Sequence, residues 1–313
     1  MHFETFRQVA KAELHVHLEG SFSVNRALAL AGEKPDHPWN GLAPQALERR
    51  LVPGNFEQFI EQFMLGYRLL KTKEHFQKVT EDLCAEFERQ GVIYAEVLYS
   101  PGVYVQKLHR DLVDIHEGIE AGLRQFPKLR VSFILDTVLN LGYPFMNKTL
   151  ELVLADQRAW LSGFSVGGGR PDLAMDEFLP LFEQAQKAGL QLVAHVGEVD
   201  GTDNIRTLLE NTDLHRIAHG CAAADDLALC RELRDRQVAV DVCLSSNLFT
   251  GVMPDLSLHP LMTFLELGVP VTLNTDDPFY FKTNLYEEYC LAEKLGVSWD
   301  KLLEVMAYGL EFR

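Results

Sequence analysis

The chain has 313 residues, 47% of them hydrophobic, and its 29 basic and 45 acidic residues give a formal net charge of −16. A surface this acidic repels phosphate groups, so we expect no nucleic-acid partner and no anionic membrane surface. No apolar run reaches the roughly 18 residues of a membrane span, and we expect no secretory signal. The five cysteines lack a C-x-x-C spacing, which is typical of reduced thiols. These features predict a cytoplasmic protein whose partner is a small molecule, and they leave its oligomeric state open.

The first ninety residues contain one predicted strand and then a helical stretch. After a short leading arm or helix in residues 1–12, the strand lies within the segment Glu13–Gly20. Residues 20–90 have the pattern of helices, and their clearest feature is an apolar stripe with helical spacing. We expect this stripe to pack against other helices rather than to hold a ligand. It consists of Phe56, Phe59, Ile60, Phe63, Met64 and Tyr67.

From residue 92 onward, apolar runs of strand length alternate with helix-length segments such as Phe178–Ala188 and Leu227–Asp235. The runs are Val92–Leu98, Val131–Val138, Gly163–Val166, Leu190–His195, Arg216–His219, Val238–Leu244 and Pro270–Asn274. Continuous apolar runs suit parallel strands that are buried on both faces. With the first strand they make eight β/α units, which predict an α/β (β/α)₈ TIM barrel. We expect a single domain over 1–313 with a helical insertion at about 20–90 after the first strand; an open doubly wound sheet is the alternative.

Polar residues gather where these strands end. His15 and His17 are two residues apart on the first strand, so their side chains leave the same face. His195 ends the fifth strand, His219 ends the sixth, and Asp276 follows the eighth. In a barrel, the C-terminal strand ends form one active-site face, and closure makes the first and eighth strands neighbours. We therefore expect these side chains to meet over one mouth of the barrel.

Each of these residues also has a plain structural explanation. His195 suits a hydrogen-bonded core position, and Asp276-Asp277-Pro278 suits the start of a helix. Taken together, three imidazoles and one carboxylate make a divalent metal site with room for water, and nitrogen and oxygen ligands favour zinc. The remaining histidines are expected at the surface or in packing: His2, His37, His75, His109, His116, His215 and His259.

Six short motifs occur in a fixed order along the chain. They are His-Val-His-Leu-Glu-Gly at 15–20, Gly-Gly-Gly at 167–169, His-Val-Gly-Glu at 195–198, Arg-Ile-Ala-His-Gly at 216–220, Ser-Ser-Asn at 245–247 and Asn-Thr-Asp-Asp-Pro at 274–278. In this order the chain resembles the adenosine deaminase family over nearly its whole length. The H-x-E…P-C-x-x-C signature of cytidine-type deaminases is absent.

The resemblance implies a set of roles. One zinc ion per chain would be held by His15, His17, His195 and Asp276. Catalytic residues would be Glu198 (proton donor to purine N1), His219 (beside the reacting water, as a base or an electrostatic stabiliser) and Asp277 (hydrogen bonded to N7). Substrate contacts would come from His17, Glu19, the backbone N–H of Gly168 (to N3) and Asp277. Zinc makes hydroxide available near neutral pH, and a raised pKa is expected for Glu198 in an apolar pocket.

The implied reaction is hydrolytic deamination of a 6-aminopurine nucleoside, of the adenosine or 6-amino-6-deoxyfutalosine type. Adenine itself is the alternative substrate. A single-metal amidohydrolase acting on a non-purine substrate, and a non-catalytic binding protein, are alternatives from other classes. The sequence departs from the family pattern at Glu19, where aspartate is usual, and at Ser165 and Arg170, which flank the glycine turn. We hypothesise that Arg170, or another basic residue near the insertion, pairs with a carboxylate on the substrate; a solvated arginine after the turn is the alternative.

Overall fold

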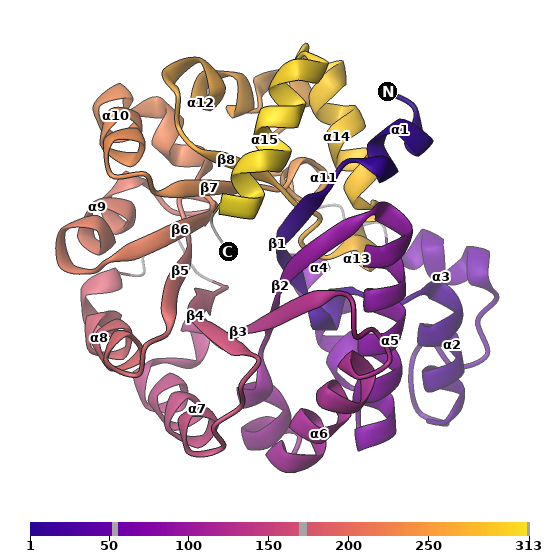
Figure 1. Cartoon of the computed structure of the whole chain (residues 1–313). Coiled ribbons are helices and arrows are strands. Elements are labelled where there is room, and N and C mark those ends of the chain that lie inside the picture. The colour runs from indigo at the N-terminus through magenta and orange to yellow at the C-terminus, as the bar shows by residue number, and fades with distance from the viewer. Residues whose placement is uncertain (52–55, 169–173, 312–313) are drawn as a thin grey trace.

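Eight parallel strands form one sheet in which each strand is hydrogen bonded to the next in chain order. The computed structural model describes residues 1–51, 56–168 and 174–311. Figure 1 shows the strands around a central axis with helices outside them. The strands are β1 (Lys11–His17), β2 (Val92–Tyr99), β3 (Arg130–Val138), β4 (Leu161–Gly167), β5 (Gln191–Val196), β6 (Leu214–His219), β7 (Ala239–Val242) and β8 (Val271–Leu273). A doubly wound sheet would reverse its strand order, so this order confirms the predicted (β/α)₈ barrel.

The barrel closes between β8 and β1 through only a few contacts. Val16 forms an isolated parallel bridge with Asp276, just beyond the end of β8. The His17 amide donates to the Asp276 carbonyl at 2.8 Å, and the Asp276 amide donates to the His15 carbonyl at 3.0 Å. Below this bridge, the Asn274 side-chain oxygen accepts bonds from the amides of Leu14 and His15. A side chain therefore takes part in joining the first and last strands.

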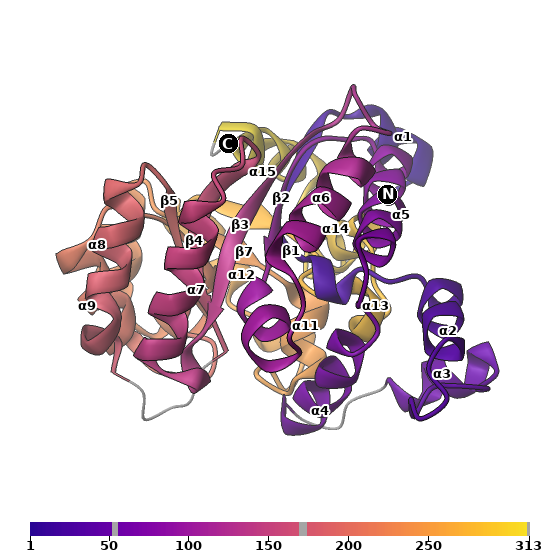
Figure 2. The same ribbon diagram turned by 90° about the horizontal axis from the view of Figure 1, so that it is seen from below.

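Helices surround the sheet, and four of them lie between β1 and β2. Figure 2 shows α2 and α3 beside the barrel, whereas α4 lies at one of its ends together with α11. Among the described helices, none is both long and apolar enough to cross a membrane. The α-helices are α1 (Phe3–Gln8), α2 (Val24–Gly32), α3 (Pro44–Arg50), α4 (Phe56–Tyr67), α5 (Lys73–Gln90), α6 (Leu112–Leu123), α7 (Tyr143–Ala155), α8 (Leu179–Lys187), α9 (Thr202–Asn211), α10 (Leu227–Asp235), α11 (Leu244–Phe249), α12 (Leu261–Leu267), α13 (Pro278–Phe281), α14 (Leu285–Lys294) and α15 (Trp299–Glu311).

The barrel interior holds a fully buried ion network centred on Arg216 of β6. Its guanidinium group contacts Asp241 of β7 at 3.0 Å, Glu96 of β2 at 2.5 Å and the Leu14 carbonyl of β1 at 3.2 Å. Both carboxylates have further donors, from the Tyr94 and Thr272 hydroxyl groups. An apolar layer, consisting of Leu98, Ile134, Val193 and Ala218, is also buried there. Ala218 lies two residues beyond Arg216, so this layer is nearer the C-terminal strand ends.

Candidate active site

Four side chains converge at the C-terminal ends of β1, β5 and β8, as the sequence predicts. One ligand-type atom from each of His15, His17, His195 and Asp276 lies within 4.8 Å of the other three. Asp276 Oδ1 is 3.2 Å from Nε2 of both His15 and His17, and His17 Nε2 is 3.3 Å from His195 Nε2. All four residues are buried.

The electrostatics of this group fit a divalent cation. Both ring nitrogens of His15 are buried, and neither forms a well-aligned hydrogen bond, although Nε2 lies 3.2 Å from Asp276 Oδ1. His195 Nδ1 lies 3.0 Å from the Val166 carbonyl, so its Nε2 is left for another ligand. Burial lowers the pKa of His15 and His195, which keeps their rings neutral. Burial also opposes protonation of His17, but the acidic side chains around it, Asp276 among them, outweigh burial and raise its pKa, so the site favours positive charge.

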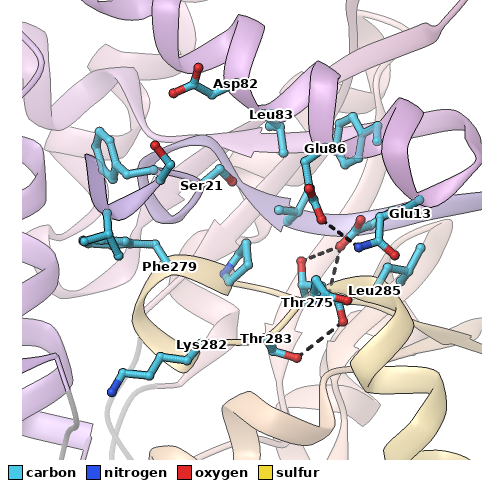
Figure 3. A pocket seen from close by; sticks show the side chains of 18 of the residues that line it. Glu13, Ser21, Asp82, Leu83, Glu86, Thr275, Phe279, Lys282, Thr283 and Leu285 are labelled. Carbon is cyan, nitrogen blue, oxygen red and sulfur yellow. Dashed lines mark hydrogen bonds between the residues drawn. The ribbon is translucent and has the colours of Figure 1, made fainter. Parts of the chain in front are cut away.

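Local backbone geometry holds Asp276 in place. Its φ of 61° lies in the left-handed region, which is costly for a residue with a Cβ but is tolerated best by aspartate and asparagine. The preceding residue, Thr275, donates through both its amide and its hydroxyl group to Glu13 Oε1. Figure 3 shows Glu13 and Thr275 side by side in a second cavity of about 520 Å³, which lies outside the convergent group.

Glu198 and His219 lie beside the four side chains. His219 Nε2 is 3.8 Å from Glu198 Oε1 and 3.8 Å from Asp276 Oδ2. Like Asp276, His219 has a left-handed backbone, with a φ of 66°, where β6 ends. Burial raises the pKa of Glu198, so its carboxyl group holds a proton at higher pH than an exposed glutamate. This arrangement places a proton donor at the edge of the convergent group.

A chain of hydrogen bonds fixes the tautomer of His219. The Leu261 amide donates to His259 Nδ1 at 3.1 Å, so the proton of a neutral His259 is on Nε2. That nitrogen is 3.2 Å from Asn247 Oδ1, and Asn247 Nδ2 is 3.3 Å from His219 Nδ1. His219 Nδ1 is therefore an acceptor, and its Nε2–H faces the site. From the sequence we expect only a surface or packing role for His259; the structure connects it to His219 through Asn247.

Asp277 and Gly168 line the cavity that three residues of the convergent group, His17, His195 and Asp276, also line. Asp277 Oδ1 is buried and has no hydrogen-bond partner. Gly20 allows the carboxylate to approach the chain, because a Cβ at Gly20 would lie 1.9 Å from Asp277 Oδ1. Gly168 has a φ of 70°, which a side chain would disfavour. Steric requirements therefore explain why glycine stands at these two motif positions.

The cavity above these residues has a volume of about 470 Å³, and α4 forms one of its walls. The sequence predicts that the α4 stripe packs against other helices rather than holds a ligand, and the structure places all six of its residues on the wall of this cavity. Helical periodicity shows that one face is apolar but does not show what covers that face. Some of the stripe also packs conventionally: Phe59 and Phe63 contact the ring of Tyr280. Among the described residues, Lys107 is the only lysine or arginine on the cavity wall.

Two cavity residues were missed by the sequence analysis. Ser100 follows β2, and Asp136 lies near the end of β3, both on the cavity wall. The Ser100 hydroxyl donates to Asp136 Oδ2 at 3.0 Å, and the Ser100 amide donates to Glu19 Oε1 at 3.0 Å. Glu19 is fully buried and is not among the residues that line the cavity, so its substrate contact stays a prediction. Arg170 and Gly169 lie outside the described residues, and the hypothesis for Arg170 is not tested here.

Comparison with known proteins gives a consistent result. Residues 10–312 match the family model described as adenosine deaminase. An adenine deaminase of Rhizobium meliloti is 32% identical, covering 90% of this chain and 86% of its own. An aminodeoxyfutalosine deaminase of Streptomyces coelicolor is also 32% identical, covering 96% of this chain and 79% of its own. The structure of an amidohydrolase from Burkhoderia ambifaria with bound Zn has a TM-score of 0.90 at 21% identity, covering 100% of this chain and 87% of that one.

Proposed function

Because the chain belongs to the adenosine deaminase family, we propose that it hydrolyses the 6-amino group of a purine nucleoside and releases ammonia. The observation that carries this proposal is the juxtaposition of the four convergent side chains with Glu198 and His219; five of these six residues, all but His15, line one cavity. Hydrolytic deamination needs both an activated water and a proton donor for the ring, and this arrangement contains groups suited to each.

His15, His17, His195 and Asp276 would hold a single zinc ion. Three imidazoles and a carboxylate are a suitable donor set for zinc at a catalytic site, and the structural neighbour from Burkhoderia ambifaria contains bound Zn. When bound, such an ion supplies Lewis acidity that lowers the pKa of water toward neutrality.

Three groups would orient the purine. Glu198, whose pKa burial raises, would donate a proton to N1 and so make C6 more electrophilic. The Gly168 N–H would donate to N3. Asp277 Oδ1, which has no partner in the structure, would face N7. Because burial and the neighbouring Asp276 raise the pKa of Asp277 well above its usual range, its carboxyl group would be protonated and could donate to N7.

His219 would act as a hydrogen-bond donor. Because Asn247 holds its Nδ1 as an acceptor, the neutral ring carries its proton on Nε2, the atom that faces Glu198 and Asp276. Of the two roles that the resemblance implies, this tautomer favours electrostatic stabilisation of negative charge on oxygen over removal of a proton from water.

The substrate class is the finer part of the proposal. Relatives named for adenine and for aminodeoxyfutalosine are equally similar, at 32% identity. The cavity volume of about 470 Å³ lies within the range of about 300–1,000 Å³ typical of pockets for drug-sized ligands. We propose a purine nucleoside of the adenosine or aminodeoxyfutalosine type as substrate, with adenine as the alternative.

The test is ammonia release from a panel of adenosine, aminodeoxyfutalosine and adenine by the metal-loaded protein. We expect the highest kcat/KM for one of the two nucleosides. A preference for adenine would select the alternative. If no 6-aminopurine releases ammonia and an unrelated amide is hydrolysed, the protein is a different amidohydrolase and not a purine deaminase.

A further inference from the structure

Ser100 and Asp136, on the β2–β3 side of the cavity, form a polar pair whose hydrogen bonding is incomplete. Asp136 Oδ2 accepts from the Ser100 hydroxyl at 3.0 Å. Its other oxygen, Oδ1, is buried and has no hydrogen-bond partner. Asp136 as a whole is only 4% exposed, and it lines the cavity. Leaving a buried carboxylate oxygen without a donor is costly, and such groups in a native protein need an explanation.

Among the residues that the structure describes, none donates a hydrogen bond to Oδ1. His195 Nδ1, at 4.0 Å, is too distant for a hydrogen bond and already lies 3.0 Å from the Val166 carbonyl. On the β4 side, a Cβ at Gly167 would lie 2.7 Å from Oδ2 and 2.8 Å from Oδ1 of Asp136. The glycine at this position therefore leaves room for the carboxylate, and a larger residue would displace it.

The orientation of the purine ring in the cavity follows from the proposed function, on which this inference rests. Glu198 of the β5 end faces N1, Asp277 of the β8 end faces N7, and Gly168 of the β4 end faces N3. On a purine ring, N9 lies between N7 and N3, opposite the N1–C6 edge. In a barrel with strands in chain order, the substituent at N9 then points toward the ends of β1, β2 and β3, where Ser100 and Asp136 lie.

We propose that Asp136 Oδ1 accepts a hydrogen bond from a sugar hydroxyl group at this N9 substituent, which makes Asp136 a specificity-determining residue for nucleosides. A hydroxyl is a donor that suits an acceptor-only carboxylate. The Ser100 bond holds the carboxylate with its second oxygen available. The α4 wall belongs to the same cavity of about 470 Å³ that Ser100 and Asp136 line. The N9–H of free adenine is the competing donor, and the experiment below separates the two.

The experiment compares kcat/KM of wild type and Asp136→Ala for adenosine, 2′-deoxyadenosine, 3′-deoxyadenosine and adenine. We expect adenosine to lose about 10–100-fold, the range for a hydrogen bond to a charged acceptor. The deoxynucleoside that lacks the contacted hydroxyl is expected to be a poorer substrate of wild type and to lose less than about threefold on mutation. Equal losses on all four substrates would overturn the proposal, as would a loss confined to adenine.

Two further variants separate recognition from folding. Thr137→Val changes the next residue of β3, whose hydroxyl bonds the Ser165 carbonyl away from the cavity wall, and it should leave the ranking of substrates unchanged. Asp136→Asn keeps the side-chain shape; we expect an unchanged or higher Tm together with reduced kcat/KM for adenosine. A lowered Tm with uniformly reduced activity would identify a structural residue instead. Wild-type activity on adenine alone would overturn the inference but leave the deaminase, whereas no activity on any 6-aminopurine would overturn both.

Discussion

Two buried polar groups lie one above the other in this barrel, and they differ in whether their hydrogen bonds are complete. Around Arg216, the guanidinium group and both carboxylates have partners at 2.5–3.2 Å. At the C-terminal mouth, atoms of His15, Glu19, Asp136 and Asp277 are buried without a well-aligned hydrogen bond. Both groups are equally inaccessible, so burial alone does not distinguish them.

We interpret this difference as separating a structural group from a functional one. A satisfied network stabilises one arrangement of the strands that contribute to it, here β1, β2, β6, β7 and β8. Unsatisfied atoms, together with left-handed backbone at His219 and Asp276, are costs that a protein retains where a ligand supplies the missing partners. Substitutions in the two groups test this distinction.

Asp276→Asn should abolish metal binding and activity together. Asparagine tolerates the left-handed backbone as well as aspartate does, so the fold is expected to persist. Removing a ligand should cost more than the roughly 10–100-fold typical of an outer partner. Metal content by mass spectrometry and ammonia release measure the two effects. A variant with full metal content and full activity would contradict the assignment of Asp276.

Glu198→Gln should lower kcat/KM by about 10²–10⁴-fold, the usual contribution of a general acid, while the metal content stays unchanged. Because the active form of Glu198 is the protonated one, wild-type activity should fall as the pH rises through its raised pKa. The decrease in adenine absorbance with adenosine, recorded across pH, checks both points. Retained activity in this variant would remove Glu198 from the role of acid.

Arg216→Met should lower the free energy of unfolding by about 3–5 kcal/mol, because it leaves Glu96 and Asp241 as unpaired buried carboxylates. The control is Arg26→Met, which breaks the partly exposed pair with Asp82 and should cost at most about 1 kcal/mol. Denaturant unfolding monitored by circular dichroism measures both. Equal small effects would show that the lower network is not a structural element.

Glu288→Gln should flatten the pH dependence of stability. Burial raises the pKa of Glu288 to about 7, above the unfolded value of about 4.3. Its protonated form therefore contributes stability that is present below pH 4.3 and is lost as the pH rises through 7. From pH 5 to 8, wild type should lose about 1–3 kcal/mol more than the variant. Parallel pH curves for the two proteins would contradict this prediction.

The sequence predicted the barrel and the convergent site well because both depend on short-range patterns. Strand-length apolar runs mark the sheet, and a polar residue at the end of such a run falls at the mouth of the barrel. His15, His195 and Asp276 are therefore predictable even though they are far apart in the chain. Their convergence follows from the closed order of the strands.

Other features depend on contacts that no local pattern records. The α4 stripe has the spacing of any amphipathic helix, so its position over the cavity appears only in three dimensions. Asp136 and Ser100 are single polar residues on different strands. The link from His259 through Asn247 to His219 joins a loop, a helix and a strand end. A strand-end criterion applied to β2 and β3 as strictly as to β5 and β8 would have selected Ser100 and Asp136.

The join between β8 and β1 has a consequence for how the protein is assembled. Three of the four proposed zinc ligands come from the two sides of this join, so a bound ion would connect the chain's first strand to the segment after its last. Loading with metal would then act as a late cross-link in folding. Protein prepared in a chelator is expected to lose amide protection first at His15 and His17, while the Arg216 network keeps the opposite end of the barrel intact.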